Sequence, residues 1–248
     1  MNQETVTINC REHDAKTNMA RPFNVIKYTL NYQSNNADKK LIDHLIAEGT
    51  RLANSVNPGA ANDANLKRSY NRISSNCIAG AVSEYLWKEY LNQERETVTT
   101  TKMKDAGTQI DLAIISNNKK VEVRSSFPRN GIPFAVCSRQ YQFDIIGPYS
   151  NSYKPGEIQK DYYIRALFHL QNPTGLLSRI KQNGFEAYLT GGATWQMMIN
   201  PQFAIEKDFI PDDEMSIKRI ASKTSYRVVP FSSALDTIEI YKLIMAEK

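Results

Sequence analysis

Residues 109–126, QIDLAIISNNKKVEVRSS, are the most informative stretch of this chain. Its two β-branched runs, separated by Asn-Asn, predict a β-hairpin. Because alternate side chains of a strand share a face, Glu122, Arg124 and Ser126 are expected to point the same way. A loop of Ser116 and Asn117, or one of residues 115–118, sets a register that places Asp111 directly opposite Glu122. Such pairs have Cβ atoms about 4.5 to 5.5 Å apart, so the two carboxylates can share one divalent cation.

Two acids facing each other within apolar β sequence repel one another unless a counterion lies between them. A metal ion would relieve that repulsion, polarise a phosphate oxygen and lower the pKa of a bound water. The guanidinium of Arg124 would offset charge that develops on the phosphorus. Gln109 lies close enough in sequence to approach the metal or the water, with an edge polar residue as the alternative. These are the requirements of phosphodiester hydrolysis.

The chain has few other metal ligands. Its three histidines stand alone, and its three cysteines (Cys10, Cys77 and Cys137) lie far apart without zinc spacing, so we expect them to be structural thiols. A metal site would therefore be built from carboxylates, which favours a hard ion such as Mg²⁺.

Positive charge gathers around the proposed acidic centre. The chain has a formal net charge of +5, and the window from Lys102 to Arg139 holds seven basic and three acidic residues. Most of the net charge thus lies in this window, which favours a polyanionic partner. Hydrophobic residues make up 41% and charged residues 23%, a composition typical of a folded globular protein.

Periodicity predicts an α/β or α+β protein with a central mixed sheet flanked by helices. We find no repeat or interdomain linker and expect a single domain over residues 1–248. The last helix is expected to be capped by Ser232 or Ser233, with Asp236 near its positive amino end. The expected strands cover residues 5–10, 23–32, 97–103, 109–116, 119–126, 162–170, 187–190 and 226–231, and the expected helices residues 39–55, 66–92, 176–182, 193–198 and 234–246.

Asp111, ten intervening residues and then Glu122-Val-Arg124 resemble the core of the PD-(D/E)XK nuclease superfamily, to which many type II restriction endonucleases belong. A helix before the hairpin often supplies another acid in that family, and Glu84 matches this placement. The segments KDYYIRALF (160–168) and AYLTGGATW (187–195) resemble the family's later core strands and the turn into a helix. The likeness covers residues 69–200, with the amino-terminal strands and helix and the carboxy-terminal strand and helix as additions.

The resemblance implies a restriction-endonuclease-like fold and a Mg²⁺-dependent DNA endonuclease. Asp111, Glu122 and Glu84 would hold Mg²⁺, Arg124 would stabilise the phosphate or align the water, and water would be the nucleophile. Double-stranded DNA is the implied substrate, and a homodimer would bring one site to each strand. The chain departs from the pattern at Ile110, where the family has Pro, and at Arg124, where it has Lys. Arginine cannot act as a base, although it can hold a phosphate through two hydrogen bonds.

Nucleic-acid contacts are expected from Gln109 and Ser126 of the hairpin region and from three basic residues in loops rich in Gly, Pro and Asn: Arg129, Arg139 and Lys154. The alternative for each loop residue is an ordinary solvated charge.

Two other functions remain open. The first is a catalytically inactive nucleic-acid-binding protein of the same fold, which the arginine at position 124 favours. The second is a nuclease acting on RNA or on repair intermediates. No run of about 18 apolar residues is present to span a membrane, and the amino terminus lacks the apolar core of a signal peptide, so a cytoplasmic location is expected.

Overall fold

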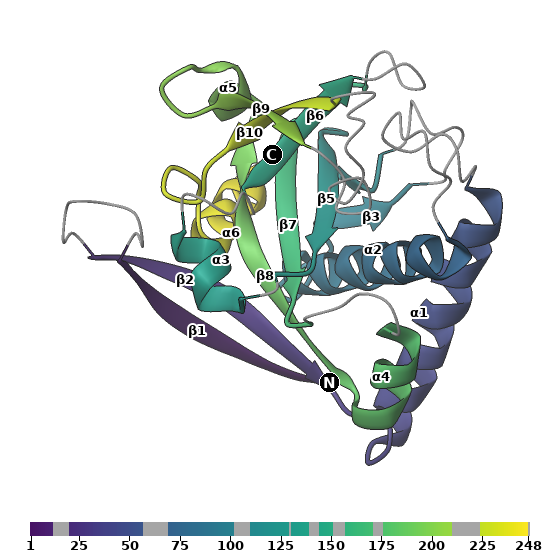
Figure 1. Ribbon diagram of the computed structural model, residues 1–248. Helices are drawn as coiled ribbons and strands as arrows, with labels where there is room; N and C mark the ends of the chain where they lie inside the picture. Colours follow the sequence, from purple (N-terminus) through teal and green to yellow (C-terminus); the bar gives the residue numbers. More distant parts are fainter. Residues whose placement is uncertain are drawn as a thin grey trace, which may run out of the picture.

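A computed structural model describes residues 1–11, 20–56, 69–101, 110–128, 130–138, 144–150, 157–170, 176–209 and 224–247. In it the chain forms a mixed α/β structure around a seven-stranded sheet of order β1-β2-β8-β7-β5-β4-β3 (Figure 1). Strands β5 and β7 run parallel, and the other neighbours in this sheet are antiparallel. The expected mixed sheet flanked by helices is confirmed.

The strands of this sheet fall on the predicted segments. Their bounds are β1 (Asn2–Arg11), β2 (Ala20–Leu30), β3 (Val98–Thr100), β4 (Leu112–Ile114), β5 (Lys120–Ser126), β7 (Tyr162–Phe168) and β8 (Phe185–Thr194).

A second sheet of three strands was not predicted. It has the order β6-β10-β9 and consists of β6 (Ile145–Ser150), β10 (Thr224–Val229) and β9 (Ile205–Phe209). Only β10 was expected, because β6 contains Gly147-Pro148, a turn signal in sequence, and β9 is short and carries three charged residues.

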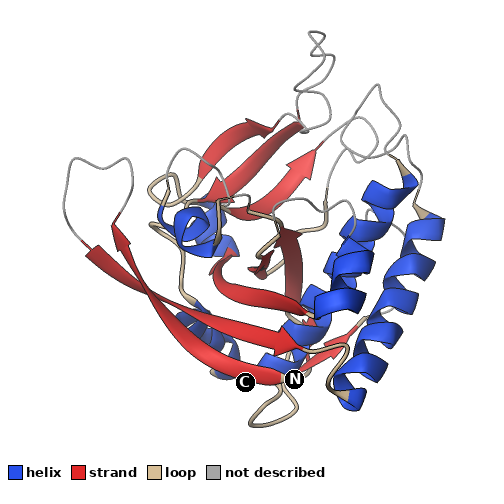
Figure 2. Ribbon diagram, turned by 60° about the horizontal axis from the view of Figure 1, so that its bottom comes forward, coloured by secondary structure: helices blue, strands red, loops and turns tan. Residues whose placement is uncertain are grey.

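The helices are α1 (Asn36–Ser55), α2 (Tyr70–Leu91), α3 (Ile132–Cys137), α4 (Leu176–Asn183), α5 (Trp195–Ile199) and α6 (Thr237–Met245). Figure 2 shows the two long helices lying side by side against the sheet. The expected cap of α6 is wrong: Asp236, rather than Ser232 or Ser233, caps it in a capping box with Glu239. The carboxylate of Asp236 accepts the Glu239 N–H, and the Glu239 side chain accepts the Asp236 N–H.

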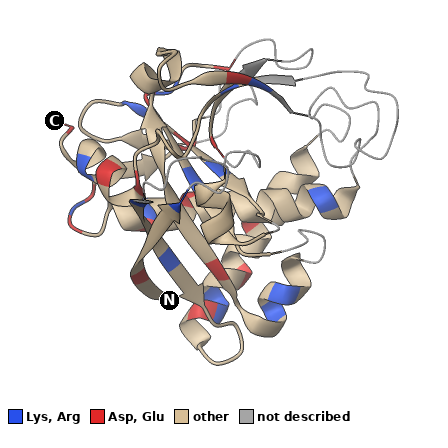
Figure 3. Cartoon of the chain, turned by 60° about the vertical axis from the view of Figure 1, so that its left-hand side comes forward, with Lys and Arg blue, Asp and Glu red and all other residues tan. Residues whose placement is uncertain are grey.

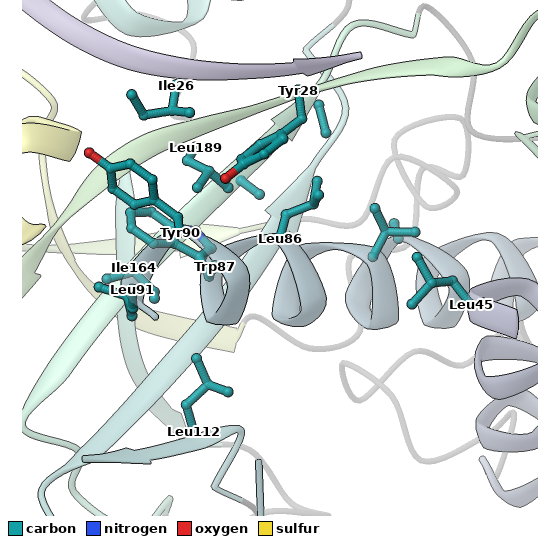
Figure 4. Packing of buried hydrophobic residues seen from close by; sticks show 14 of the residues in the cluster. Ile26, Tyr28, Leu45, Leu86, Trp87, Tyr90, Leu91, Leu112, Ile164 and Leu189 are labelled. Carbon is teal, nitrogen blue, oxygen red and sulfur yellow. The ribbon is translucent and has the colours of Figure 1, made fainter. Parts of the chain in front are cut away.

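Strand β7 lies in the middle of the sheet and is buried on both faces. Tyr162, Ile164, Ala166 and Phe168 join the apolar cluster that α2 covers, where Trp87 and Leu86 pack near Ile164 and Leu189 (Figure 4). Tyr163 and Leu167 join a second cluster on the opposite face, which also contains residues of α3. Arg165 lies between Tyr163 and Leu167 on the same face of β7, and it brings a charged group into the interior.

A disulfide joins Cys10 of β1 to Cys137 of α3, which are separated by 127 residues in sequence. The expectation of structural thiols is therefore wrong for these two cysteines, because the fold brings distant segments together. Cys77 takes no part in this disulfide.

Reducing the disulfide is expected to lower the free energy of unfolding by about 2 to 4 kcal/mol, because a long loop in the unfolded chain is no longer closed. Thermal unfolding with and without a reducing agent measures this, and the Cys10→Ser/Cys137→Ser variant should match the reduced protein. The Cys77→Ser variant is the control and should respond to the reductant as the wild type does. An identical Tm for oxidised and reduced protein would contradict the expectation.

Among the described helices, none combines the length and apolar character that a bilayer crossing requires.

Candidate active site

The hairpin has the register predicted from the sequence. Leu112 pairs with Val121 and Ala113 with Lys120, so Asp111, immediately before β4, lies across from Glu122. The turn is closed by the Ile114 N–H, which donates to the carbonyl of Lys119 at 2.8 Å. The carboxylate of Asp111 is held against β5, where its Oδ2 accepts the Val123 N–H at 2.7 Å. Both acids are buried, Asp111 at 8% and Glu122 at 6% exposure.

Two cations contact the carboxylate of Glu122. Its Oε1 lies 3.0 Å from Nη2 of Arg124, and its Oε2 lies 3.0 Å from Nζ of Lys160. Burying a carboxylate is costly unless a partner compensates its charge, and these contacts provide that compensation. Within the part of the chain that the structure describes, Oε2 nevertheless accepts no hydrogen bond and has the ionic contact with Lys160.

Arg124 lies between two acids, Glu122 and Glu157, and the contact with Glu157 was not predicted from the sequence. Its Nη2 also lies 2.9 Å from both carboxylate oxygens of Glu157, whose side chain is 2% exposed. The guanidinium therefore bridges Glu122 and Glu157. Figure 3 shows basic and acidic segments close together on the strands at the centre of the molecule.

Lys160 is a site residue that sequence reasoning missed. It lies two residues before the first residue of β7 and is 2% exposed, and its backbone N–H donates to the hydroxyl of Tyr163 at 3.2 Å. The parallel pairing of β5 with β7, in which Glu122 is the partner of Tyr163, brings Lys160 to the acid. The sequence feature that points to Lys160 is a lysine just before a strand that is apolar on both faces. The local sequence does not show which strand pairs with β7, so it could not place Lys160 beside Glu122.

Burial and charge repulsion raise the pKa of two acids of the site, Asp111 and Glu84. Burial and then the charge of Glu122 raise the pKa of Asp111 to about 7, although the Val123 N–H, Arg124 and Lys160 act in the opposite direction. Burial and then the charge of Asp111 raise the pKa of Glu84 to about 8. Burial and neighbouring negative charge thus make Asp111 and Glu84 harder to ionise, and a nearby cation would reverse this effect.

Glu84 lies on α2, as predicted, and its charge is coupled to that of Asp111. Within the described ranges, however, no three His, Cys, Asp or Glu side chains are grouped so that they could hold a metal. The role of Glu84 as a third metal ligand stays a prediction. The register of β4 and β5 brings Asp111 and Glu122 opposite each other.

The expected nucleic-acid contacts fall mostly outside the described residues. This applies to Gln109, Arg129, Arg139 and Lys154. Ser126 lies on β5, where its hydroxyl accepts a hydrogen bond from Nη2 of Arg165.

Comparison of the chain with protein-family models, with curated proteins and with solved structures finds no match. Functional inference therefore depends on the residues and geometry of this chain.

Proposed function

We propose that the chain is a Mg²⁺-dependent nuclease with a restriction-endonuclease-like core, and more specifically a type II restriction enzyme. The observation that supports this most strongly is the pairing of Asp111 and Glu122 across β4 and β5, with Lys160 and Arg124 both in contact with Glu122. Paired carboxylates beside cationic groups suit phosphodiester hydrolysis, in which a metal and fixed positive charges stabilise the developing negative charge.

The two acids fit a magnesium ion. Mg²⁺ is commonly bound through one or two carboxylates, with waters and substrate phosphates as its other ligands. Oε2 of Glu122 is buried and has no hydrogen bond from the described residues, and burial and the charge of Glu122 make the carboxyl of Asp111 hard to ionise, so a cation would satisfy both groups. Bound there, Mg²⁺ would polarise a phosphate oxygen and activate a water.

The chain's own residues have distinct tasks in this proposal. Asp111 and Glu122 would hold the metal, and the Val123 N–H fixes the orientation of the Asp111 carboxylate. Lys160 provides a buried ammonium next to Glu122. It would take the role of the lysine that the family pattern has at position 124. Arg124 contacts a phosphate oxygen through its planar guanidinium. Glu84, whose pKa is about 8, carries a proton at neutral pH and adds little negative charge until a cation binds.

Double-stranded DNA is the proposed substrate, and a homodimer is the proposed assembly. The net charge of +5 supports a polyanionic substrate, since basic surfaces attract phosphate backbones and raise association rates.

Incubation of the purified protein with supercoiled plasmid and Mg²⁺ tests the enzyme proposal. We expect nicked and linear products with Mg²⁺ and none with excess EDTA. Discrete fragments from a sequenced phage genome would support cleavage at a specific sequence, whereas smearing or nicking at branched structures would favour a repair nuclease, and cutting of RNA alone an RNA nuclease.

A binding protein without turnover is the second candidate. The arginine at position 124, tied to Glu122 and Glu157 by ion pairs, favours this alternative because arginine does not exchange protons near neutral pH. Duplex binding without cutting of any sequence tried would support it and contradict the nuclease proposal.

The Arg124→Lys variant is expected to cut DNA about 10- to 100-fold more slowly than wild type, but measurably. Lysine keeps the positive charge and loses the planar hydrogen-bonding group, which corresponds to one charge-assisted hydrogen bond. Initial plasmid-nicking rates measure the effect, with Arg124→Ala expected to be slower still. Equal rates for Arg124→Lys and Arg124→Ala would contradict a role for the positive charge.

A further inference from the structure

A buried arginine that the proposed mechanism does not use lies next to the site. Arg165 is in the middle of β7 and is 2% exposed. On β7 it occupies the row that contains Tyr163 and Leu167, which pack into an apolar cluster. A guanidinium in such a position loses its hydration and needs partners inside the protein to compensate.

Arg165 has fewer partners than its position requires. Nη2 donates to Oγ of Ser126, whereas Nε and Nη1 are buried and have no hydrogen-bond partner among the described residues. Asp144 is an acid whose charge acts on Arg165, but Asp144 forms an ion pair with Lys207. Two buried donor nitrogens without acceptors are an unusual cost for a folded protein.

The neighbour of Arg165 is a second cation. Arg124 on β5 and Arg165 on β7 are paired in the parallel register, so both side chains lie on the same face of adjacent strands, which are about 4.8 Å apart. Burial, opposed by Asp144 and reinforced by Arg124, lowers the pKa of Arg165 to about 10. Arg124 already contacts the carboxylates of Glu122 and Glu157, and an anion that reached both guanidinium groups would offset their repulsion.

The backbone at Arg165 is fixed from two sides. Its carbonyl accepts hydrogen bonds from Nε1 of Trp87 at 3.1 Å and from Oγ1 of Thr190 at 3.3 Å. The pairing of β7 with β8 shifts by one residue between Ile164 and Ala166, and Gly191 on β8 has φ of 82°. Such bulges re-aim side chains and are common near functional sites. These contacts fix the backbone of Arg165, but they provide no acceptor for Nε and Nη1 of its side chain.

We propose that Arg165 and Arg124 together form a phosphate-binding site for a nucleic-acid backbone, in which Arg165 extends the phosphate contact of Arg124 away from the paired acids. This identification of the anion rests on the proposed nuclease function. Nη2 of Arg124 lies 3.0 Å from Glu122 and Arg165 is the partner of Arg124 on the next strand, so the site begins at the acid and continues onto β7. In the free protein the carboxylate of Glu157 contacts Arg124, and the phosphate takes its place on binding.

Thermal unfolding of the full chain in EDTA, with inorganic phosphate added at constant ionic strength, tests this site without the metal or any turnover. We expect phosphate at about 100 times its Kd to raise the Tm of wild type by roughly 5 to 10 °C. Arg165→Met should lose this rise, yet its Tm without phosphate should equal or exceed that of wild type, because an apolar side chain replaces an unsatisfied buried charge. Arg227→Met, which removes an arginine of an exposed ion pair with Glu206, should keep the rise.

Three results would overturn the site: no phosphate-induced rise in wild type, an undiminished rise in Arg165→Met, or a fall in the Tm of Arg165→Met without phosphate. The last would show that the guanidinium holds the fold as a counterion of Asp144. Arg165→Lys, which keeps the buried charge, should show at most a weakened rise.

Binding of a duplex oligonucleotide in EDTA identifies the source of the phosphate. Arg165→Met should weaken duplex affinity about 10-fold or more. Unchanged affinity, with the response to inorganic phosphate lost, would contradict the assignment to a nucleic-acid backbone. Plasmid cleavage by wild type reports separately on the nuclease proposal, so either proposal can fail while the other stands.

Discussion

The Asp111→Asn variant is expected to lose Mg²⁺-dependent DNA cleavage by about 10³-fold or more. A neutral amide would remove one of the two carboxylates proposed to hold the metal, and the metal's contribution to stabilising the transition state is several kcal/mol. Initial cleavage rates at saturating Mg²⁺ measure the effect. Asp43→Asn is a matched control on α1, where the acid accepts a hydrogen bond from Tyr32, and it should cut at the wild-type rate.

The same substitution should not weaken the fold at alkaline pH. The pKa of Asp111 is raised from 3.8 to about 7 in the folded protein, so the folded state binds a proton more tightly than the unfolded state does. The wild type therefore loses stability as pH rises from about 4 to 7, by up to about 4 kcal/mol. Asp111→Asn lacks this loss, so its Tm should exceed that of wild type at pH 8 and should match it near pH 4.

Two outcomes would count against this interpretation of Asp111. A lower Tm for Asp111→Asn than for wild type at pH 8 would indicate that the carboxylate supports the fold. Cleavage at the wild-type rate would remove Asp111 from the mechanism.

The Lys160→Met variant is expected to lose both stability and activity. Lys160 and Glu122 are an ion pair in which both side chains are at most 8% exposed, and removal of one partner leaves the other charge less compensated. Breaking such a pair costs about 3 to 5 kcal/mol, which corresponds to a fall in Tm of roughly 6 to 20 °C in a chain of this size. Cleavage should fall at least about 100-fold, because the ammonium nearest the paired acids is gone.

Matched variants separate this effect from general loss of charge. Lys119→Met removes a lysine that is 41% exposed and paired with Glu247, and it should cost at most about 1 kcal/mol. Glu122→Gln/Lys160→Met should be less destabilised than the sum of its single variants, because each single variant already breaks the pair. A Lys160→Met protein as stable and as active as wild type would contradict both roles.

The hairpin could be predicted from the sequence because its determinants are local. The alternating pattern and a short turn fix the register within residues 109–126, so the pairing of Asp111 with Glu122 followed from one stretch of chain. The spacing of Glu122 and Arg124 on one strand face likewise needed only strand geometry. The long helix that carries Glu84 was readable from its apolar periodicity.

The remaining groups of the site could not be predicted, because they come from long-range pairing. Lys160, Glu157 and Arg165 reach the hairpin only through the parallel alignment of β5 and β7, which no local pattern specifies. The disulfide between Cys10 and Cys137 depends in the same way on packing between segments 127 residues apart. Asp236 lies at the amino end of α6 as expected, but the capping role was assigned to Ser232 or Ser233 because serine and aspartate are equally good capping residues in sequence.

Calorimetric titration of the wild-type protein with Mg²⁺, without nucleic acid, measures the property on which the nuclease proposal depends. We expect a saturable binding site that is lost both in Asp111→Asn and in Glu122→Gln and is kept in Asp43→Asn. Magnesium binding that persists unchanged in the first two variants, or no binding at millimolar Mg²⁺ with or without a DNA duplex, would contradict a metal site between these carboxylates.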